Sequence, residues 1–525
     1  MLNFNHKIRK YLFFWLTPLL LSCIWLIAYF QPIDLTVIDL GRHLKNGELI
    51  LERQFDVLST NAYAVDHANF PFVNHHWLSG VLFFSIFHVF NWLGLHLFYG
   101  GILLICFFLF WQSLRPRQLP FLSVCVGIVA AILWMIRLEI RPEGIGLLFL
   151  LLELALINHW QQEKTNRISI RSIGLFILIQ FLWINFHLSF WLGLWILGGY
   201  LVSKLLVEHQ INSRLWFLLS GCLLVSLLNP HGLTGLLYPF NVFTNYEYQL
   251  VENQTPWFLK TRLSLPSIWL LLWSWFAAAS LFLFSVLHRL MNQSKTAREP
   301  GHWLFSHFLW ATGLLLGWTA LRSATLFIVL VAPTVVQTLH LIIRAVPTHL
   351  LNLPTKIVDQ LKISLGWSIW AAIIFLVASG HFEMGIGLQN MGLGLDQQTA
   401  IEIGMVTKLF PSNLGQESVK LFNNYDIGSF GIFALPKTVT VYVDNRPEAY
   451  PSGFFADYIA LQSNPTAWKQ ATNSHQFNWV LFGTRDQTPW GRSFTQFIQQ
   501  DEDWEVMFKD ERIIILRRKS GTVPS

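Results

Sequence analysis

The chain has 525 residues, of which 53% are hydrophobic and only 13% are charged, whereas soluble globular proteins carry about 25% charged residues. This composition excludes a soluble protein of this length. The formal net charge of +6 arises in the first 380 residues, which hold 24 Lys/Arg and 15 Asp/Glu, while residues 381–525 hold 12 and 15. The basic excess therefore belongs to the apolar part, where it indicates membrane topology rather than nucleic-acid binding.

An apolar segment opens the chain. Lys7, Arg9 and Lys10 precede an apolar run over 11–30, which is long enough to cross a bilayer. Because the run has no small-residue cleavage site, we predict a retained anchor whose N-terminus stays in the cytoplasm. Further apolar runs bring the total to about eleven predicted crossings, at 94–113, 121–137, 144–160, 173–187, 188–207, 215–229, 267–290, 303–321, 323–343 and 362–380.

Basic residues fall in alternate loops between these runs, at Arg115–Arg117, 164–171, Arg214, 295–298 and 344–356. Placing those loops in the cytoplasm satisfies the positive-inside rule throughout. The segment 77–90 is apolar enough to cross, yet a crossing there would invert every later loop. We therefore predict a juxtamembrane helix at the outer face, with an ordinary span as the alternative. The protein is expected in the plasma (inner) membrane, with its C-terminal domain extracytoplasmic.

This topology collects polar residues on the outer side, beginning with a large first outer loop over 31–76. Carboxylates serve as general bases or hold divalent cations, imidazoles hold cations, and arginines bind phosphate. Charged groups at membrane ends are costly unless they are paired or face water, so the set favours a shared water-filled site. For each residue alone, a solvated loop position or an interfacial anchor is the alternative. The set comprises Asp39, Arg42, His43, His75, His76, Arg141, Glu143, Asn185, His187, His231 and Arg322.

The histidines of this set allow two interpretations. Asp39 and His43 are four residues apart, so on a helix they share a face. His43 is then either a ligand or a helix-capping or solvated residue. His75 and His76 are a weak metal signal, because adjacent residues point apart on a helix.

The composition changes after residue 380. We predict a linker over 381–408, which includes the glycine-rich stretch Gly385–Gly394, and a soluble α/β domain over 409–525. Aromatic and β-branched residues indicate strands at Lys420–Asn424, Phe430–Leu435, Val439–Asp444, Trp479–Phe482, Glu505–Lys509 and Arg512–Arg517. Helices are predicted at Ala456–Gln462, Thr466–Thr472 and Ser493–Gln500. The stretch Val443–Tyr450 is either a ligand site at a strand end or a turn shaped by a structural Asp444–Arg446 pair.

The segment Ile38–Glu48 resembles the acidic segment that opens the outer loop in the C-type membrane glycosyltransferases, which use lipid-phosphate-linked sugars. Pro71–Leu78 stands where the aminoarabinose and mannosyl transferases of this group have a Lys-Pro-Pro-Leu-type segment entering an aromatic helix. Arg141–Glu143 stands where they place a further acidic residue. The resemblance covers the arrangement of about the first 200 residues, with departures. Asp39 is followed by Leu40 rather than by a second acid, and Val-Asn-His-His replaces Lys-Pro-Pro.

The resemblance implies a polytopic α-helical membrane protein with a C-terminal soluble α/β domain, which transfers a sugar from a polyprenyl-phosphate-linked donor to an extracytoplasmic lipid or glycan acceptor. A divalent metal ion is the one cofactor expected, and nucleic acid is not expected as a partner. The alternatives are a non-enzymatic protein of envelope polysaccharide assembly and a transporter. Under the first reading Asp39 and Glu143 are catalytic, Arg42, Arg141, Asn185, His187, His231 and Arg322 bind substrate, and His43, His75 and His76 hold the metal.

Overall fold

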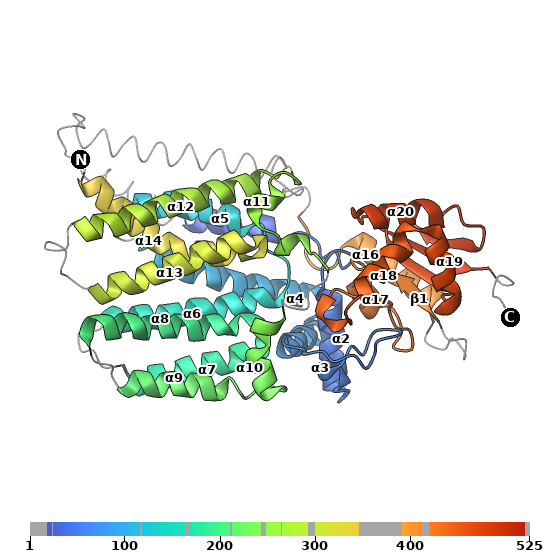
Figure 1. Ribbon diagram of the computed structural model, residues 1–525, viewed down its shortest axis with the longest axis horizontal. Coiled ribbons are helices and arrows are strands. Elements are labelled where there is room, and N and C mark those ends of the chain that lie inside the picture. Colours follow the sequence, from blue (N-terminus) through green and yellow to red (C-terminus); the bar gives the residue numbers. More distant parts are fainter. Residues whose placement is uncertain are drawn as a thin grey trace.

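Apolar helices make up most of the chain and pack side by side in one bundle, with a smaller α/β domain at one end (Figure 1). The computed structural model describes residues 18–23, 25–115, 118–162, 168–209, 213–242, 248–263, 265–291, 300–345, 391–411 and 419–519. The predicted run at 362–380 lies outside these residues. The first helix, Pro18–Tyr29, is described only in part.

Five helices in the described ranges are long and apolar enough to cross a membrane, namely Trp77–Ser113, Pro142–Gln162, Leu188–Val207, Pro266–Met291 and Leu321–Ile343. Helices α4 (Trp77–Ser113), α6 (Pro142–Gln162) and α12 (Pro266–Met291) are apolar all round, as helices between lipid and protein must be. The bundle also contains α5 (Pro120–Trp134), α7 (Ile170–Phe186), α8 (Trp191–Glu208), α9 (Ser213–Val225), α10 (Gly232–Asn241), α13 (Pro300–Thr319) and α14 (Ala324–Ala345). A helical membrane-type protein is thus confirmed, whereas eleven crossings remain a prediction.

Helix α4 breaks at Asn91, where the backbone has non-helical angles, a positive φ of 56° and a ψ of −166°. The break separates residues 77–90 from the remainder of α4, at the position where the sequence predicted a juxtamembrane helix to end.

The C-terminal domain contains one four-stranded sheet in the order β1-β2-β4-β3. Strand β1 (Leu421–Asn423) runs parallel to β2 (Trp479–Gly483), while β2 and β3 (Trp504–Lys509) each pair antiparallel with β4 (Ile513–Arg518). Every residue of β2 is buried, as in a strand covered on both faces. Helices α18 (Phe454–Ser463), α19 (Pro465–Ser474) and α20 (Pro489–Ile498) complete the domain.

Three predicted elements of this region differ in the structure. Phe430–Leu435, predicted as a strand, lies largely in helix α17 (Gly428–Ala434), because a short apolar run does not distinguish a strand from a buried helix. Val439–Asp444 forms only an isolated bridge between Val441 and Ala64. Helix α16 (Gln397–Leu409) occupies the second half of the predicted linker, and the Asp396 side chain caps it by accepting from the Thr399 N–H.

Helix α2 (Leu40–Leu51) packs against both the bundle and the C-terminal domain. A Cβ on Gly47 would lie 2.1 Å from the carbonyl oxygen of Gly80 in α4, and one on Gly41 would lie 2.6 Å from that of Ser429 in α17. Glycine is therefore required at both close approaches. The Arg42 N–H also donates to the Ser429 hydroxyl at 2.9 Å. These contacts fix the start of α2, where Asp39 lies.

Candidate functional site

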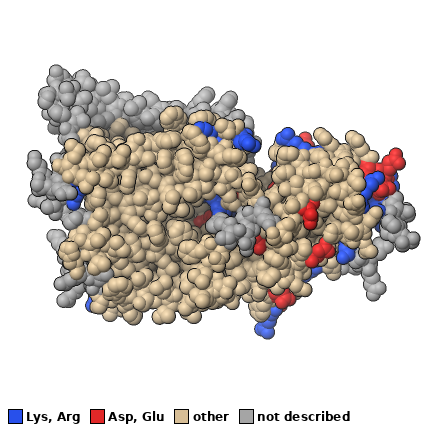
Figure 2. Space-filling view, viewed as in Figure 1, with Lys and Arg blue, Asp and Glu red and all other residues tan. Residues whose placement is uncertain are grey.

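A cavity of about 490 Å³ lies where the bundle meets the C-terminal domain. Figure 2 shows basic and acidic side chains in a hollow there, on a bundle surface that is otherwise almost uncharged. The cavity brings together Asp39, Arg42, His75, His76, Arg141, Glu143, His187 and Arg322 from the set predicted from the sequence. Its remaining wall is largely apolar and includes Leu188, Trp191, Leu192, Val242, Leu250, Leu316 and Leu326.

Asp39 directly precedes α2, and cationic groups surround its carboxylate. The Arg42 Nη2 lies 3.3 Å and the His43 Nε2 3.4 Å from Oδ2, while the Arg141 Nε lies 3.6 Å from Oδ1. Burial raises the pKa of Asp39, but Arg141, His43 and Arg42 outweigh burial and hold that pKa well below its usual value. Asp39 is therefore ionised at neutral pH.

The turn between α5 and α6 contributes a second group of ion pairs. Arg137 donates to Glu252 at 2.5 Å and to Glu143 at 2.8 Å. Arg141 also donates to Glu252, at 3.3 Å. Burial raises the pKa of Glu252, but Arg137 and Arg141 outweigh burial and lower it. We call Asp39, Arg137, Arg141, Glu143 and Glu252 the cavity cluster.

The histidine rings near the cavity lie close to one another, and only His76 and His187 are stacked. Ring centroids lie 5.5 Å apart for His43 and His76, 4.0 Å for His75 and His76, and 4.9 Å for His76 and His187. His43 is fully buried behind the cavity wall. Burial is the main cause that lowers the pKa of His75 to about 3 and that of His187 to about 4, so both rings are neutral at pH 7.

In the ranges that the structure describes, no group of three or more His, Cys, Asp or Glu side chains could hold a metal ion. The metal role of His43, His75 and His76 therefore stays a prediction, and the chemistry below uses no metal.

Asn185 and His231 lie outside the cavity lining. The Asn185 side chain accepts from the Trp77 indole at 3.1 Å and donates to the Leu228 carbonyl at 3.0 Å. The His231 N–H donates to the Asn229 side chain at 2.9 Å. These contacts hold helices and turns together, so substrate binding by either residue remains only a prediction. Arg322 lies in the short helix η3 (Leu321–Ser323) and lines the cavity.

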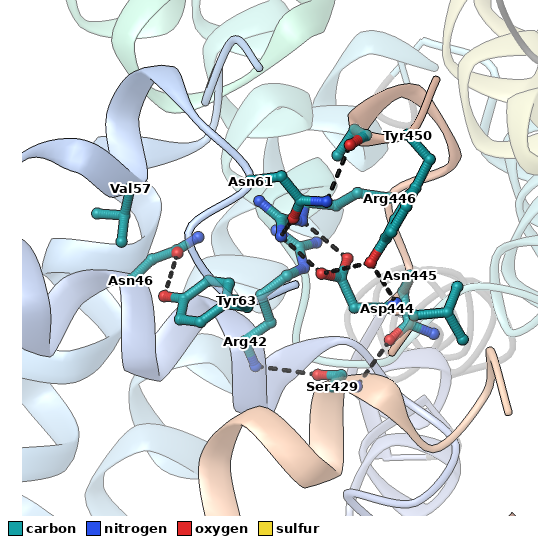
Figure 3. A network of polar contacts seen from close by, with 12 residues as sticks. Arg42, Asn46, Val57, Asn61, Tyr63, Ser429, Asp444, Asn445, Arg446 and Tyr450 are labelled. Carbon is teal, nitrogen blue, oxygen red and sulfur yellow. Dashed lines mark hydrogen bonds and ion pairs between the residues drawn. The ribbon is translucent and has the colours of Figure 1, made fainter. Parts of the chain in front are cut away.

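The C-terminal domain supplies one wall of the cavity through Asn445, Arg446 and Glu448. Arg446 donates to both carboxylate oxygens of Asp444, at 2.8 and 2.6 Å, and to Asn61 of the first outer loop at 2.6 Å (Figure 3). The Tyr450 hydroxyl accepts from the Asp444 N–H at 2.9 Å. We call Asn61, Asp444, Arg446 and Tyr450 the interdomain network. The sequence predicted that Val443–Tyr450 forms either a ligand site or a turn shaped by an Asp444–Arg446 pair, and the structure contains that pair.

Sequence reasoning missed Arg137, Glu252 and Arg446 as neighbours of the site. Arg137 stands at the end of the predicted crossing 121–137, four residues before Arg141, and its charge at that position was an available signal. Glu252 lies in a long outer loop whose fold no local pattern predicts. Its partners are more than 100 residues away in the chain.

Solved structures of similar fold extend over nearly the whole chain, and they are enzymes of the kind that the sequence resemblance predicted. The oligosaccharyltransferase AglB of Archaeoglobus fulgidus, in complex with an inhibitory peptide and a dolichol-phosphate, matches with a TM-score of 0.60 at 10% identity, over 98% of this chain and 75% of that chain. The same protein crystallised with Zn and sulfate gives 0.54 at 11% identity, over 96% and 74%.

ArnT of Cupriavidus metallidurans in the apo state gives a TM-score of 0.50 at 10% identity, over 96% of this chain and 97% of that chain. No protein-family model matches the sequence, and no curated protein matches it significantly. The comparisons therefore establish the fold, and the function must be argued from the cavity.

Proposed function

We propose that this protein is a membrane glycosyltransferase, which moves a sugar from a polyprenyl-phosphate-linked donor to a lipid or glycan acceptor outside the cytoplasm. The observation that carries the proposal is the cavity, in which an ionised carboxylate, several arginines and an apolar wall lie together. Similar folds include AglB, whose structure holds a dolichol-phosphate. We further propose about eleven crossings, a cytoplasmic N-terminus and a C-terminal domain on the side of the cavity.

The residues of the cavity suit the two ends of such a donor. The apolar wall formed by Leu188, Leu316 and Leu326 offers the kind of surface that a polyprenyl chain can cover. Arginine binds phosphate oxygens through its planar fork, and Arg141 and Arg322 both line the cavity. The apolar wall therefore matches the chain of a lipid-linked phosphate, and the arginines match its charge.

Asp39 is the residue that we assign to the chemical step. The acceptor hydroxyl would give its proton to the Asp39 carboxylate while its oxygen bonds to the anomeric carbon. The bond from that carbon to the phosphate oxygen would break, and the electron pair would leave with the polyprenyl phosphate. Arginines near the phosphate would stabilise the charge that it gains. Glu143, which Arg137 holds at 2.8 Å, would help to hold the sugar.

The test uses the full-length protein reconstituted in liposomes with a panel of undecaprenyl-phosphate-linked sugars, and measures released undecaprenyl phosphate. Asp39→Asn keeps the shape of the side chain but removes its charge, so turnover should fall by roughly 10²–10⁴. Asp56→Asn, in the same outer loop but exposed, is the matched control and should leave turnover unchanged. Full activity of Asp39→Asn would exclude Asp39 as the base.

A further inference from the structure

Glu252 occupies the space between two arginines at the edge of the cavity. Its Oε2 lies 2.5 Å from the Arg137 Nη1 and 3.3 Å from the Arg141 Nη1. Glu252 lines the cavity, whereas Arg137 lies behind it with 14% of its side chain exposed. Withdrawal of this one carboxylate would therefore uncover a guanidinium that faces the cavity.

The two arginines have the geometry of an anion site. Each guanidinium presents planar N–H donors that match two oxygens of a carboxylate or of a phosphate. In the described part of the chain, the Arg141 Nε has no hydrogen-bond partner although it is buried. It lies 3.6 Å from Asp39 and 4.0 Å from Glu139, both beyond hydrogen-bond distance. This donor would be satisfied by a ligand that brings more than one oxygen.

Charge balance indicates that a ligand would exchange with Glu252 rather than join it. Arg42, Arg137 and Arg141 carry three positive charges, and Asp39, Glu143 and Glu252 carry three negative ones. A phosphate added to this neutral group would meet three carboxylates at close range. A singly charged phosphate that replaces the Glu252 carboxylate leaves the sum unchanged and keeps both arginines paired.

The position of Glu252 permits such an exchange. It lies in the short helix η2 (Val251–Asn253). The residue after this helix, Gln254, accepts a backbone hydrogen bond from the Leu321 N–H at 3.0 Å. Its main chain is thereby tied to η3, beside Arg322. Rotation of the Glu252 side chain alone would vacate the position between the arginines, with 27% of that side chain already exposed.

We infer that Arg137 and Arg141 form a phosphate-binding site, in which the Glu252 carboxylate takes the place of the phosphate until a ligand displaces it. The ligand class is a phosphate group, either on a lipid or free. The lipid source rests on the proposed function. Glu252 thus acts as a positioning residue that keeps the arginines in place while the site is empty.

The experiment measures equilibrium binding of undecaprenyl phosphate and, separately, of inorganic phosphate to the full-length protein in detergent. Glu252→Gln keeps the size of the side chain and removes the competing charge. We expect undecaprenyl phosphate to bind at least about tenfold more tightly to this variant. Glu139→Gln makes the same substitution at a half-exposed acid 4.0 Å from Arg141, and affinity should stay unchanged. Arg137→Gln should weaken binding.

The outcomes separate the inference from the proposed function. Tighter binding of the lipid alone assigns the site to a lipid headgroup, and tighter binding of both probes assigns it to phosphate in general. A wild-type protein that binds the lipid, with Glu252→Gln binding equally or more weakly, overturns the inference and leaves the proposed function standing. If neither the wild-type protein nor Glu252→Gln binds the lipid, both the inference and the proposed function are overturned. Thermal unfolding of each variant shows whether it is folded.

Discussion

The interdomain network and the cavity cluster use the same residue types in two different environments. In the interdomain network the Asp444 and Arg446 side chains are 0% and 2% exposed, and they bond at 2.6–2.8 Å. In the cavity cluster, Asp39 is 21% and Glu252 27% exposed, and the ion-pair distances range from 2.5 Å for Arg137–Glu252 to 3.6 Å for Arg141–Asp39. The carboxylates of the cavity cluster are open to water and ligands, whereas the Asp444 carboxylate is sealed from both.

The difference separates a structural ion pair from an exchangeable one. A carboxylate that is sealed from solvent, with both oxygens hydrogen-bonded, has no route by which another anion could replace it. A carboxylate that borders a cavity remains partly hydrated, so it loses less free energy when a ligand takes its partner. The following predictions test this contrast.

The largest effect is expected from Asp444→Asn. This change leaves the buried Arg446 guanidinium without its counter-charge, which typically costs about 3–5 kcal/mol. Thermal unfolding in detergent should show a markedly lower transition temperature. Glu252→Gln is the paired variant, because Arg137 keeps Glu143 and Arg141 keeps Asp39, and its loss of stability should stay at about 1 kcal/mol. Equal losses in the two variants would remove the contrast.

Gly47→Ala should displace helix α2, which carries Asp39 into the cavity. The new Cβ would lie 2.1 Å from the Gly80 carbonyl oxygen, and such overpacking costs about 1–3 kcal/mol. Turnover should fall further than this loss of stability alone explains, because Asp39 moves with the helix. Gly101→Ala in α4, where a Cβ meets nothing within 4 Å, is the control. Wild-type turnover in Gly47→Ala would contradict the role of α2.

Arg322→Lys keeps the charge at the cavity wall and removes the planar fork. Binding of undecaprenyl phosphate should weaken about tenfold, equivalent to about 1.4 kcal/mol, while kcat changes less. Arg262→Lys, at an exposed position outside the cavity lining, should leave binding unchanged. A fall in kcat with unaltered binding would place Arg322 at the chemical step instead.

The effect that is smallest at neutral pH concerns the pH dependence of stability. The pKa of His187 is about 4 in the folded protein and near its ordinary value of about 6.5 in the unfolded chain. Between pH 6.5 and 4 the unfolded chain therefore binds a proton that the folded chain does not, and stability falls as pH falls. Above pH 6.5 this contribution is fully present and constant. His187→Gln should flatten the curve by roughly 1 kcal/mol per pH unit at most. An unchanged slope would contradict the low folded pKa.

The general fold was predictable from the sequence because a bilayer forces long apolar helices and biases basic loops to one side. The grouping of Asp39, Arg141 and Glu143 followed from the same argument, since the predicted topology puts each of them at an outer helix end. The pairing of Arg137 with Glu252 did not follow, because 115 residues separate the two. Such pairs depend on tertiary packing that no local pattern records.

The errors in the C-terminal region have a different cause. Phe430–Leu435 is apolar and short, and such runs fit a strand or a buried helix equally well. Its helix α17 is selected by contact with α2, where Gly41 allows the close approach.

The two glycine contacts of α2 bear on whether the C-terminal domain is a detachable module. One face of α2 lies against α4 and another against α17, and the Arg42 N–H is bonded to Ser429. A chain cut before α16 would expose the Gly41 face and leave that N–H without its partner. Asp39, the proposed base, would then lie at the start of a helix that packs against α4 but no longer against α17. Exchange of this domain between related proteins would have to carry α2 with it.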